Sequence, residues 1–121
     1  MTRINVGIPP IELTDKHLLA EHREIKRIPN CIAKGRYSME GIPNRFKLGE
    51  GHVKFFYNKL YYLFKRYIKL YIECKNRGFN VQCYIHAWDN VPSNLMNNYQ
   101  PTNMDRKIVQ KRINEKFKNW K

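Results

Sequence analysis

The chain has 121 residues, of which 42% are hydrophobic and 13% aromatic, so it is long enough to bury one core and its composition excludes a disordered chain. Lys and Arg number 23 against 10 Asp and Glu, which gives a net charge of +13. A small domain this basic repels itself when free, and the charge favours a polyanionic partner such as nucleic acid over an anionic membrane or a simple solubility feature.

The first predicted helix begins at Thr14 or Asp15, either of which can cap a helix N-terminus. It continues to about Lys34, where Gly35 can end it. Pro29 lacks a backbone donor, so we expect a kink at that residue. Helical spacing gathers four apolar residues on one side of this helix, namely Leu18, Ile25, Ile28 and Ile32.

A second side of the same helix is basic. Its cations follow one another at spacings of 7, 4 and 7 residues and therefore share a narrow arc: Lys16, Arg23, Arg27 and Lys34. Glu24 flanks this arc. On a single helix, a solvated charged face is the commoner interpretation of such a pattern.

Residues 35–50 are predicted to form a loop, and residues 51–77 a second helix. An apolar stripe at spacings of 3 or 4 residues predicts this helix: Val53, Phe56, Leu60, Phe64, Tyr67, Tyr71 and Cys74. The cations of the same segment are expected away from the stripe: Lys54, Lys65, Arg66 and Lys69. Its tyrosines could stack on bases, but aromatic residues at this spacing more often belong to a core.

The rest of the chain is predicted to be irregular over residues 79–101 and helical from about Pro101–Thr102. Thr102 and Asp105 have the spacing of a capping box. The apolar residues of this third helix are Met104, Ile108, Ile113 and Phe117. Arg112 and Lys116 are four residues apart and therefore lie on one face of it.

Several classes of site and location are excluded by the sequence. The three cysteines are odd in number and include no CxxC pair, which argues against a disulfide framework. No two histidines stand four residues apart, so we expect no metal site and no cofactor. An apolar run of about 18 residues and a secretory signal are both missing, so we expect an intracellular protein that does not span a membrane.

The N-terminus and one carboxylate are candidates for chemistry. Thr2 is small, so removal of Met1 would expose an α-amine with a pKa of ~7.7–8.0, which is partly neutral at physiological pH and can attack electrophilic carbon. Glu24, set beside Arg23 and Arg27, could stabilise a developing positive charge or accept a proton. An ordinary intrahelical salt bridge is the simpler interpretation of Glu24 alone.

Four blocks of the sequence are characteristic of a known family: MTRIN, ELTDKHLLAEHREIKRIPN, LGEGHVKFFYNKLYYLFKRYIKLYIECKNRGFN and QKRINEK. They closely resemble the pyrimidine-dimer DNA glycosylases of the phage endonuclease V type. The resemblance is strong over residues 1–80, weak over residues 81–104, and returns at residues 110–116. It implies a compact, all-α, single domain over residues 1–121, with three main helices, long irregular connections and an N-terminal arm inserted between helices.

The resemblance also implies site residues and a partner. Thr2 matches the nucleophile and Glu24 the essential carboxylate of a monomeric, metal-free enzyme that cuts the glycosidic bond and the backbone of lesion-containing duplex DNA. Side chains at other matching positions contact DNA: Arg3, Lys16, His17, Arg23, Arg27, Lys34, Arg112 and Lys116. In such an enzyme the Thr2 amine attacks C1′ of the 5′ nucleotide of a cyclobutane pyrimidine dimer, an imine forms, and β-elimination breaks the strand.

The sequence departs from the family pattern at four places. The linker after Asn5 is one residue longer, the loop at residues 35–48 is shorter, and His22 replaces a tyrosine. Trp120 stands where the family has a longer aromatic tract near the lesion, and we expect it to supply part of that contact. Two alternatives therefore stay open: a glycosylase or lyase for another lesion or modified base, and a non-catalytic basic protein that coats DNA.

Overall fold

The computed structural model describes the backbone of residues 2–119 and the side chains of residues 2–115. Five α-helices occur in this part of the chain: α1 (Asp15–Glu24), α2 (Arg27–Ala33), α3 (His52–Phe55), α4 (Leu60–Asn76) and α5 (Asn103–Asn119). Residues 2–119 include no strand, so the all-α prediction is confirmed. None of these helices combines the length and the apolar character that crossing a bilayer requires.

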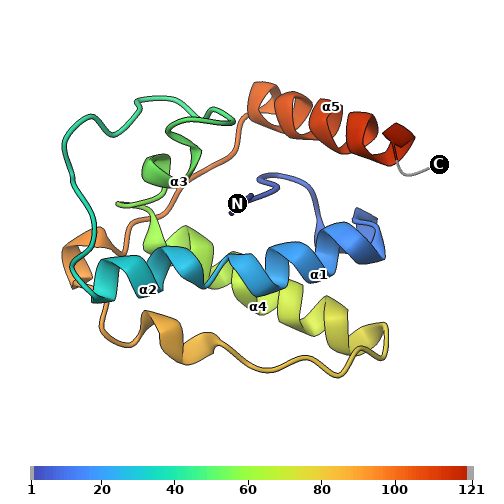
Figure 1. The fold of residues 1–121 in the computed structure, drawn as a ribbon, viewed down its shortest axis with the longest axis horizontal. Helices are drawn as coiled ribbons and strands as arrows, with labels where there is room; N and C mark the ends of the chain where they lie inside the picture. Colours follow the sequence, from blue (N-terminus) through green and yellow to red (C-terminus); the bar gives the residue numbers. More distant parts are fainter. Residues whose placement is uncertain (1, 120–121) are drawn as a thin grey trace.

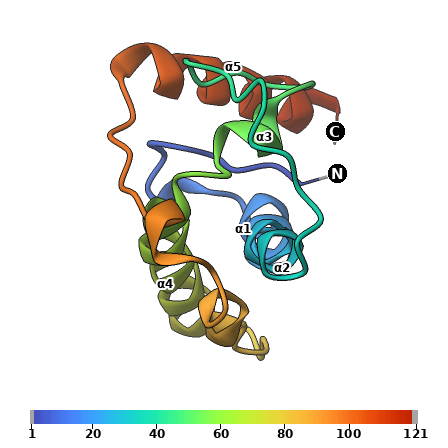
Figure 2. The same cartoon turned by 90° about the vertical axis from the view of Figure 1, so that its left-hand side faces the viewer.

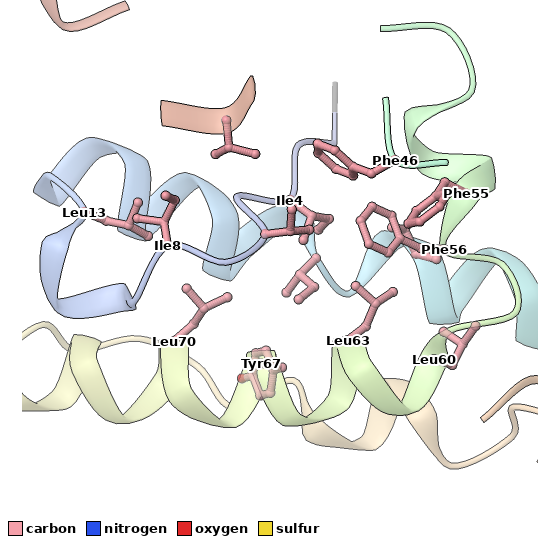
Figure 3. Packing of buried hydrophobic residues seen from close by; sticks show 14 of the residues in the cluster. Ile4, Ile8, Leu13, Phe46, Phe55, Phe56, Leu60, Leu63, Tyr67 and Leu70 are labelled. Atoms are coloured by element: carbon pink, nitrogen blue, oxygen red, sulfur yellow. The ribbon is translucent and has the colours of Figure 1, made fainter. Parts of the chain in front are cut away.

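The N-terminal arm, residues 2–9, runs through the middle of the molecule, with α5 on one side and α1 and α4 on the other (Figures 1 and 2). Its apolar residues Ile4, Val6 and Ile8 are at most 6% exposed. In Figure 3, Ile4 and Ile8 lie between α1 and the α4 residues Leu63 and Leu70. The arm is therefore a central layer of the core, as the family resemblance implied.

The first predicted helix is divided in two. Thr14 caps α1 as predicted, because its hydroxyl accepts the His17 N–H at 3.2 Å. The break lies at residues 25–26 rather than at Pro29, so the predicted kink position was wrong. Pro29 cannot donate to the Ile25 carbonyl and its ring crowds that carbonyl, which moves the break one turn towards the N-terminus. All four predicted apolar residues of this segment are buried.

The second predicted helix is also interrupted, at residues 56–59. Neither glycine nor proline occurs there, but Asn97 forms hydrogen bonds on both sides of the break. Its side-chain amide donates to the Asn58 backbone carbonyl at 2.9 Å, and its backbone carbonyl accepts the Tyr62 N–H at 3.3 Å. The buried face of α4 consists of Leu60, Leu63, Arg66, Tyr67, Leu70 and Cys74. The expectation that Arg66 lies away from the core was therefore wrong.

Residues 77–102 form an irregular connection that includes the 3-10 helices η2 (Ile85–Trp88) and η3 (Ser93–Leu95). The capping box of α5 is confirmed, since Thr102 N–H donates to the Asp105 carboxylate and Asp105 N–H to the Thr102 hydroxyl, both at 3.1 Å. Helix α5 packs on the core through Val109 and Ile113, whereas Met104 is 67% exposed and does not contribute to the core as predicted.

Candidate functional site

The position of the arm is set near its start by a buried histidine. Ile4 N–H donates to Nε2 of His52 at 2.9 Å, and Nδ1 of the same ring lies 2.9 Å from the Lys47 carbonyl oxygen. Nδ1 therefore carries the proton and donates it, while Nε2 accepts. Burial lowers the pKa of His52 to about 4, so the ring is neutral at physiological pH and remains an acceptor for the arm.

A buried polar network holds the next residues of the arm. The Asn5 amide donates to Glu21 at 2.8 Å, and its oxygen accepts a hydrogen bond from Arg112 at 2.7 Å. Glu21 forms a bidentate ion pair with Arg66, with distances of 2.5 and 2.9 Å, and Arg66 also donates to the Ile8 carbonyl at 2.9 Å. Helices α1, α4 and α5 are thus each joined to the arm by a charged side chain.

The two predicted catalytic residues belong to the arm and to the end of α1. Thr2 is 8% exposed. Glu24 is the last residue of α1, its side chain is 14% exposed, and its carboxylate lies 3.5 Å from the Arg23 guanidinium. In Figure 1 the start of the arm lies above the junction of α1 and α2, and Figure 2 shows it beside these two helices. Glu24 is the residue at the end of α1 that leads into this junction.

Two arginines and a histidine from three elements interact electrostatically at the start of the arm. His17 of α1 interacts electrostatically with Arg3 of the arm and Arg112 of α5. Burial, followed by the charges of Arg112 and Arg3, lowers the pKa of His17. Burial and the neighbouring Arg3 lower the pKa of Arg112 to about 10, which still leaves it charged at neutral pH. The charges of Arg3 and Arg112 thus lie beside a His17 ring that stays neutral at neutral pH, and a bound anion would relieve the repulsion between the two arginines.

The remaining predicted DNA contacts are only partly brought together. Arg23 and Arg27 are exposed at the adjoining ends of α1 and α2, whereas the exposed Lys34 follows α2 and therefore stands one helix away from Lys16. The four cations thus lie on two successive helices, α1 and α2, and at the residue that follows α2. The side chain of Lys116 and all of Trp120 lie outside the described residues.

Sequence reasoning missed the residues that fix the arm, above all Glu21, His52 and Arg66. Their partners in these bonds are 16 to 58 residues away along the chain, so no local spacing could reveal them. His22, the departure from the family's tyrosine, is also part of the core: its ring packs against Tyr67 and Tyr84, and the Tyr67 hydroxyl lies 3.2 Å from its Nε2. Burial, followed by the charge of Lys26, lowers the pKa of His22, so the substitution adds no charge to the core.

The comparison with protein families agrees with this geometry. Residues 1–86 match the family model described as pyrimidine dimer DNA glycosylase. The matched segment contains the arm, α1 to α4, and the histidine and ion pair that hold the arm in place. Since the match covers well over half of the 121 residues, the chain belongs to the pyrimidine dimer DNA glycosylase family.

Proposed function

We propose that this glycosylase is bifunctional, cutting the glycosidic bond of the 5′ base of a cyclobutane pyrimidine dimer in duplex DNA and then cutting the backbone at the abasic sugar. The nucleophile is the α-amine of Thr2, freed by removal of Met1. The observation that best supports this assignment is the fixed course of the arm, whose start lies over the junction that follows Glu24. An α-amine titrates at ~7.7–8.0, so a useful fraction is unprotonated at neutral pH.

The chemistry assigned to Thr2 and Glu24 is an exchange of bonds at C1′. The amine lone pair forms the C1′–N bond as the glycosidic bond breaks and its electrons leave with the base, which takes up a proton. The Glu24 carboxylate stabilises the positive charge that develops on the sugar. Opening of the C1′–O4′ bond, with protonation of O4′, then gives an imine between Thr2 and the sugar.

Strand cleavage follows from the imine. Glu24 accepts a proton from C2′, which the imine has made acidic, and the C3′–O bond breaks with release of the 3′ phosphate. The Arg23 guanidinium lies 3.5 Å from the Glu24 carboxylate and helps to position it for these steps. We assign eight side chains to contacts with DNA phosphates: Arg3, Lys16, His17, Arg23, Arg27, Lys34, Arg112 and Lys116. Trp120 is assigned to a contact with a base or sugar.

The proposal is tested by borohydride trapping on dimer-containing duplex DNA in the presence of EDTA. We expect a covalent adduct on the N-terminal peptide, and mass spectrometry of the free protein should show that Met1 has been removed. The absence of an adduct with either dimer or abasic DNA would overturn the imine mechanism. Adducts formed only with other lesions would instead assign a different substrate to the same chemistry.

Two matched variants separate the role of Glu24 from a general effect of charge. Glu24→Gln should bind dimer-containing DNA normally and form product at least about a hundredfold more slowly, the usual contribution of a positioned acid or base. Glu40→Gln removes the same charge from an exposed loop residue and should retain full activity. Equal rates for the two variants would contradict the assigned role.

A further inference from the structure

A pocket lies on the far side of the arm from the candidate catalytic site. Its volume is about 300 Å³, and it opens between the turn of the arm at residues 7–10, one face of α4, and the segment 98–101 that leads into α5. Figure 2 shows these elements on the left, whereas the start of the arm, α1 and α2 lie to the right. Six aromatic or charged side chains line this basic pocket: Tyr62, Lys65, Arg66, Lys69, Tyr99 and Arg106.

The charge of the basic pocket is strongly one-sided. No Asp or Glu is among its lining residues, and of the lining cations the buried Arg66 is already paired with Glu21. Within residues 2–115, neither Lys69 nor Arg106 forms an ion pair. Positive charges gathered in a concave site raise the local potential, so an anion bound there would relieve their repulsion.

The walls of the pocket are held in place before any ligand arrives. Gly7 has a φ of 73°, and a Cβ at this position would lie 2.3 Å from Cγ of Arg106. Glycine therefore allows Arg106 to lie directly against the arm. The Tyr62 hydroxyl bonds to the Gly7 backbone and to Arg66, and the Tyr99 hydroxyl donates to a carboxylate of α5. Such preorganisation lowers the entropy that binding would cost.

We propose that the basic pocket binds a backbone phosphate of a second DNA segment while the first segment occupies the candidate catalytic face. The ammonium group of Lys69 and the guanidinium of Arg106 donate to the phosphate oxygens, and the Tyr62 and Tyr99 rings offer an apolar wall to the adjoining sugar. The pocket is wider than a bare phosphate needs, which favours a nucleotide within a strand. This inference goes beyond the glycosylase reaction, because it concerns how the enzyme holds and exchanges DNA.

The test begins with the full-length protein saturated with an uncleavable abasic-analogue duplex. A fluorescent undamaged duplex is then added, and its binding is followed by anisotropy over a range of salt concentrations. The wild type should form the ternary complex, and the Lys69→Gln/Arg106→Gln variant should show a log–log salt slope smaller by about 1.8, or 0.9 for each lost phosphate contact. Binding of the first duplex and borohydride trapping should be unchanged. The glutamine at position 106 keeps the methylene groups that lie against Gly7.

A control variant separates the pocket from the general charge of the surface. Lys75→Gln/Lys107→Gln removes two exposed cations from the same helices, α4 and α5, outside the basic pocket. It should leave the second binding event close to that of the wild type. Inorganic phosphate should also shift the amide resonance of Gly7 in the wild type but not in the pocket variant. The proposal is overturned if the wild type binds no second duplex, if both double variants weaken it equally, or if phosphate leaves Gly7 unperturbed.

Discussion

The role of His52 gives the sharpest quantitative prediction, because its hydrogen bonds require the neutral ring. Protonation would turn Nε2 from an acceptor into a donor, and the hydrogen bond from the Ile4 N–H would be lost. The pKa of His52 is about 4 in the folded protein and about 6.5 in an unfolded chain. Between these values the unfolded chain binds a proton that the folded protein does not, so the free energy of unfolding must fall as the pH falls through this window.

The size of the effect follows from the difference in pKa. A shift from 6.5 to about 4 corresponds to roughly 3 kcal/mol in total, and about 2.5 kcal/mol of it should be lost between about pH 7 and about pH 4.5. His52→Gln removes this titration and should lose about 2.5 kcal/mol less than the wild type over the same range. At neutral pH the variant should already be less stable by about 1–3 kcal/mol, because one glutamine amide cannot satisfy both partners of the ring.

The assay is urea unfolding of wild type and variant at both pH values, followed by the fluorescence of the buried Trp88. Other groups titrate in this window, so the difference between the two proteins is the relevant quantity. His86→Gln is the matched control, since that side chain is 85% exposed and does not contact the arm. If His52→Gln and the wild type lost the same stability on acidification, the neutral histidine would not be what holds the arm.

Three further perturbations test how the arm and its supports are built. Arg66→Met leaves the buried Glu21 carboxylate without its partner, so the free energy of unfolding measured in urea should fall by about 3–5 kcal/mol, and Glu21→Gln in the same chain should restore part of it. Gly7→Ala should lower the free energy of unfolding by about 1–2 kcal/mol more than Gly35→Ala. Both glycines have a positive φ, but only at position 7 does a new Cβ meet a side chain, so equal losses would contradict this packing. Thr102→Ala should cost about 1 kcal/mol by removing the cap of α5, and α5 amides should then exchange faster.

Much of the fold could be predicted where its cause was local. The apolar spacing of Leu18, Ile25, Ile28 and Ile32 correctly identified the buried side of the first helical segment. The caps at Thr14 and Thr102 also act within a few residues. The break at residues 56–59 could not be predicted, because it is compensated by Asn97, which lies 39 residues from Asn58. A periodic pattern reports which side of a helix is apolar, and it does not report a distant side chain that satisfies an interrupted backbone.

The candidate site was less accessible to sequence reasoning than the fold. From spacing alone, the simplest interpretation of Glu24 was an ordinary salt bridge. The ion pair with Arg23 is indeed present. What raised Glu24 and Thr2 above that interpretation was the resemblance to a family, not their pattern. For Arg66 the prediction failed: the helical stripe placed it among the exposed cations, but it is 6% exposed. A buried charge needs a partner, and only the tertiary structure shows that Glu21 supplies it.

A nucleophile at the end of a chain raises a physical difficulty that the arm addresses. Terminal residues are normally the least ordered of a domain, and fixing the backbone of each one costs about 1–2 kcal/mol. Here three arm residues, Ile4, Val6 and Ile8, are buried in the core, and the polar atoms between them bond to α1, α4 and the His52 ring. Burial of the arm offsets its ordering entropy before DNA binds, so the proposed amine is carried by a segment that is already fixed in the core. A lysine on a surface helix would have to be ordered during each reaction, and its higher pKa would have to be lowered as well.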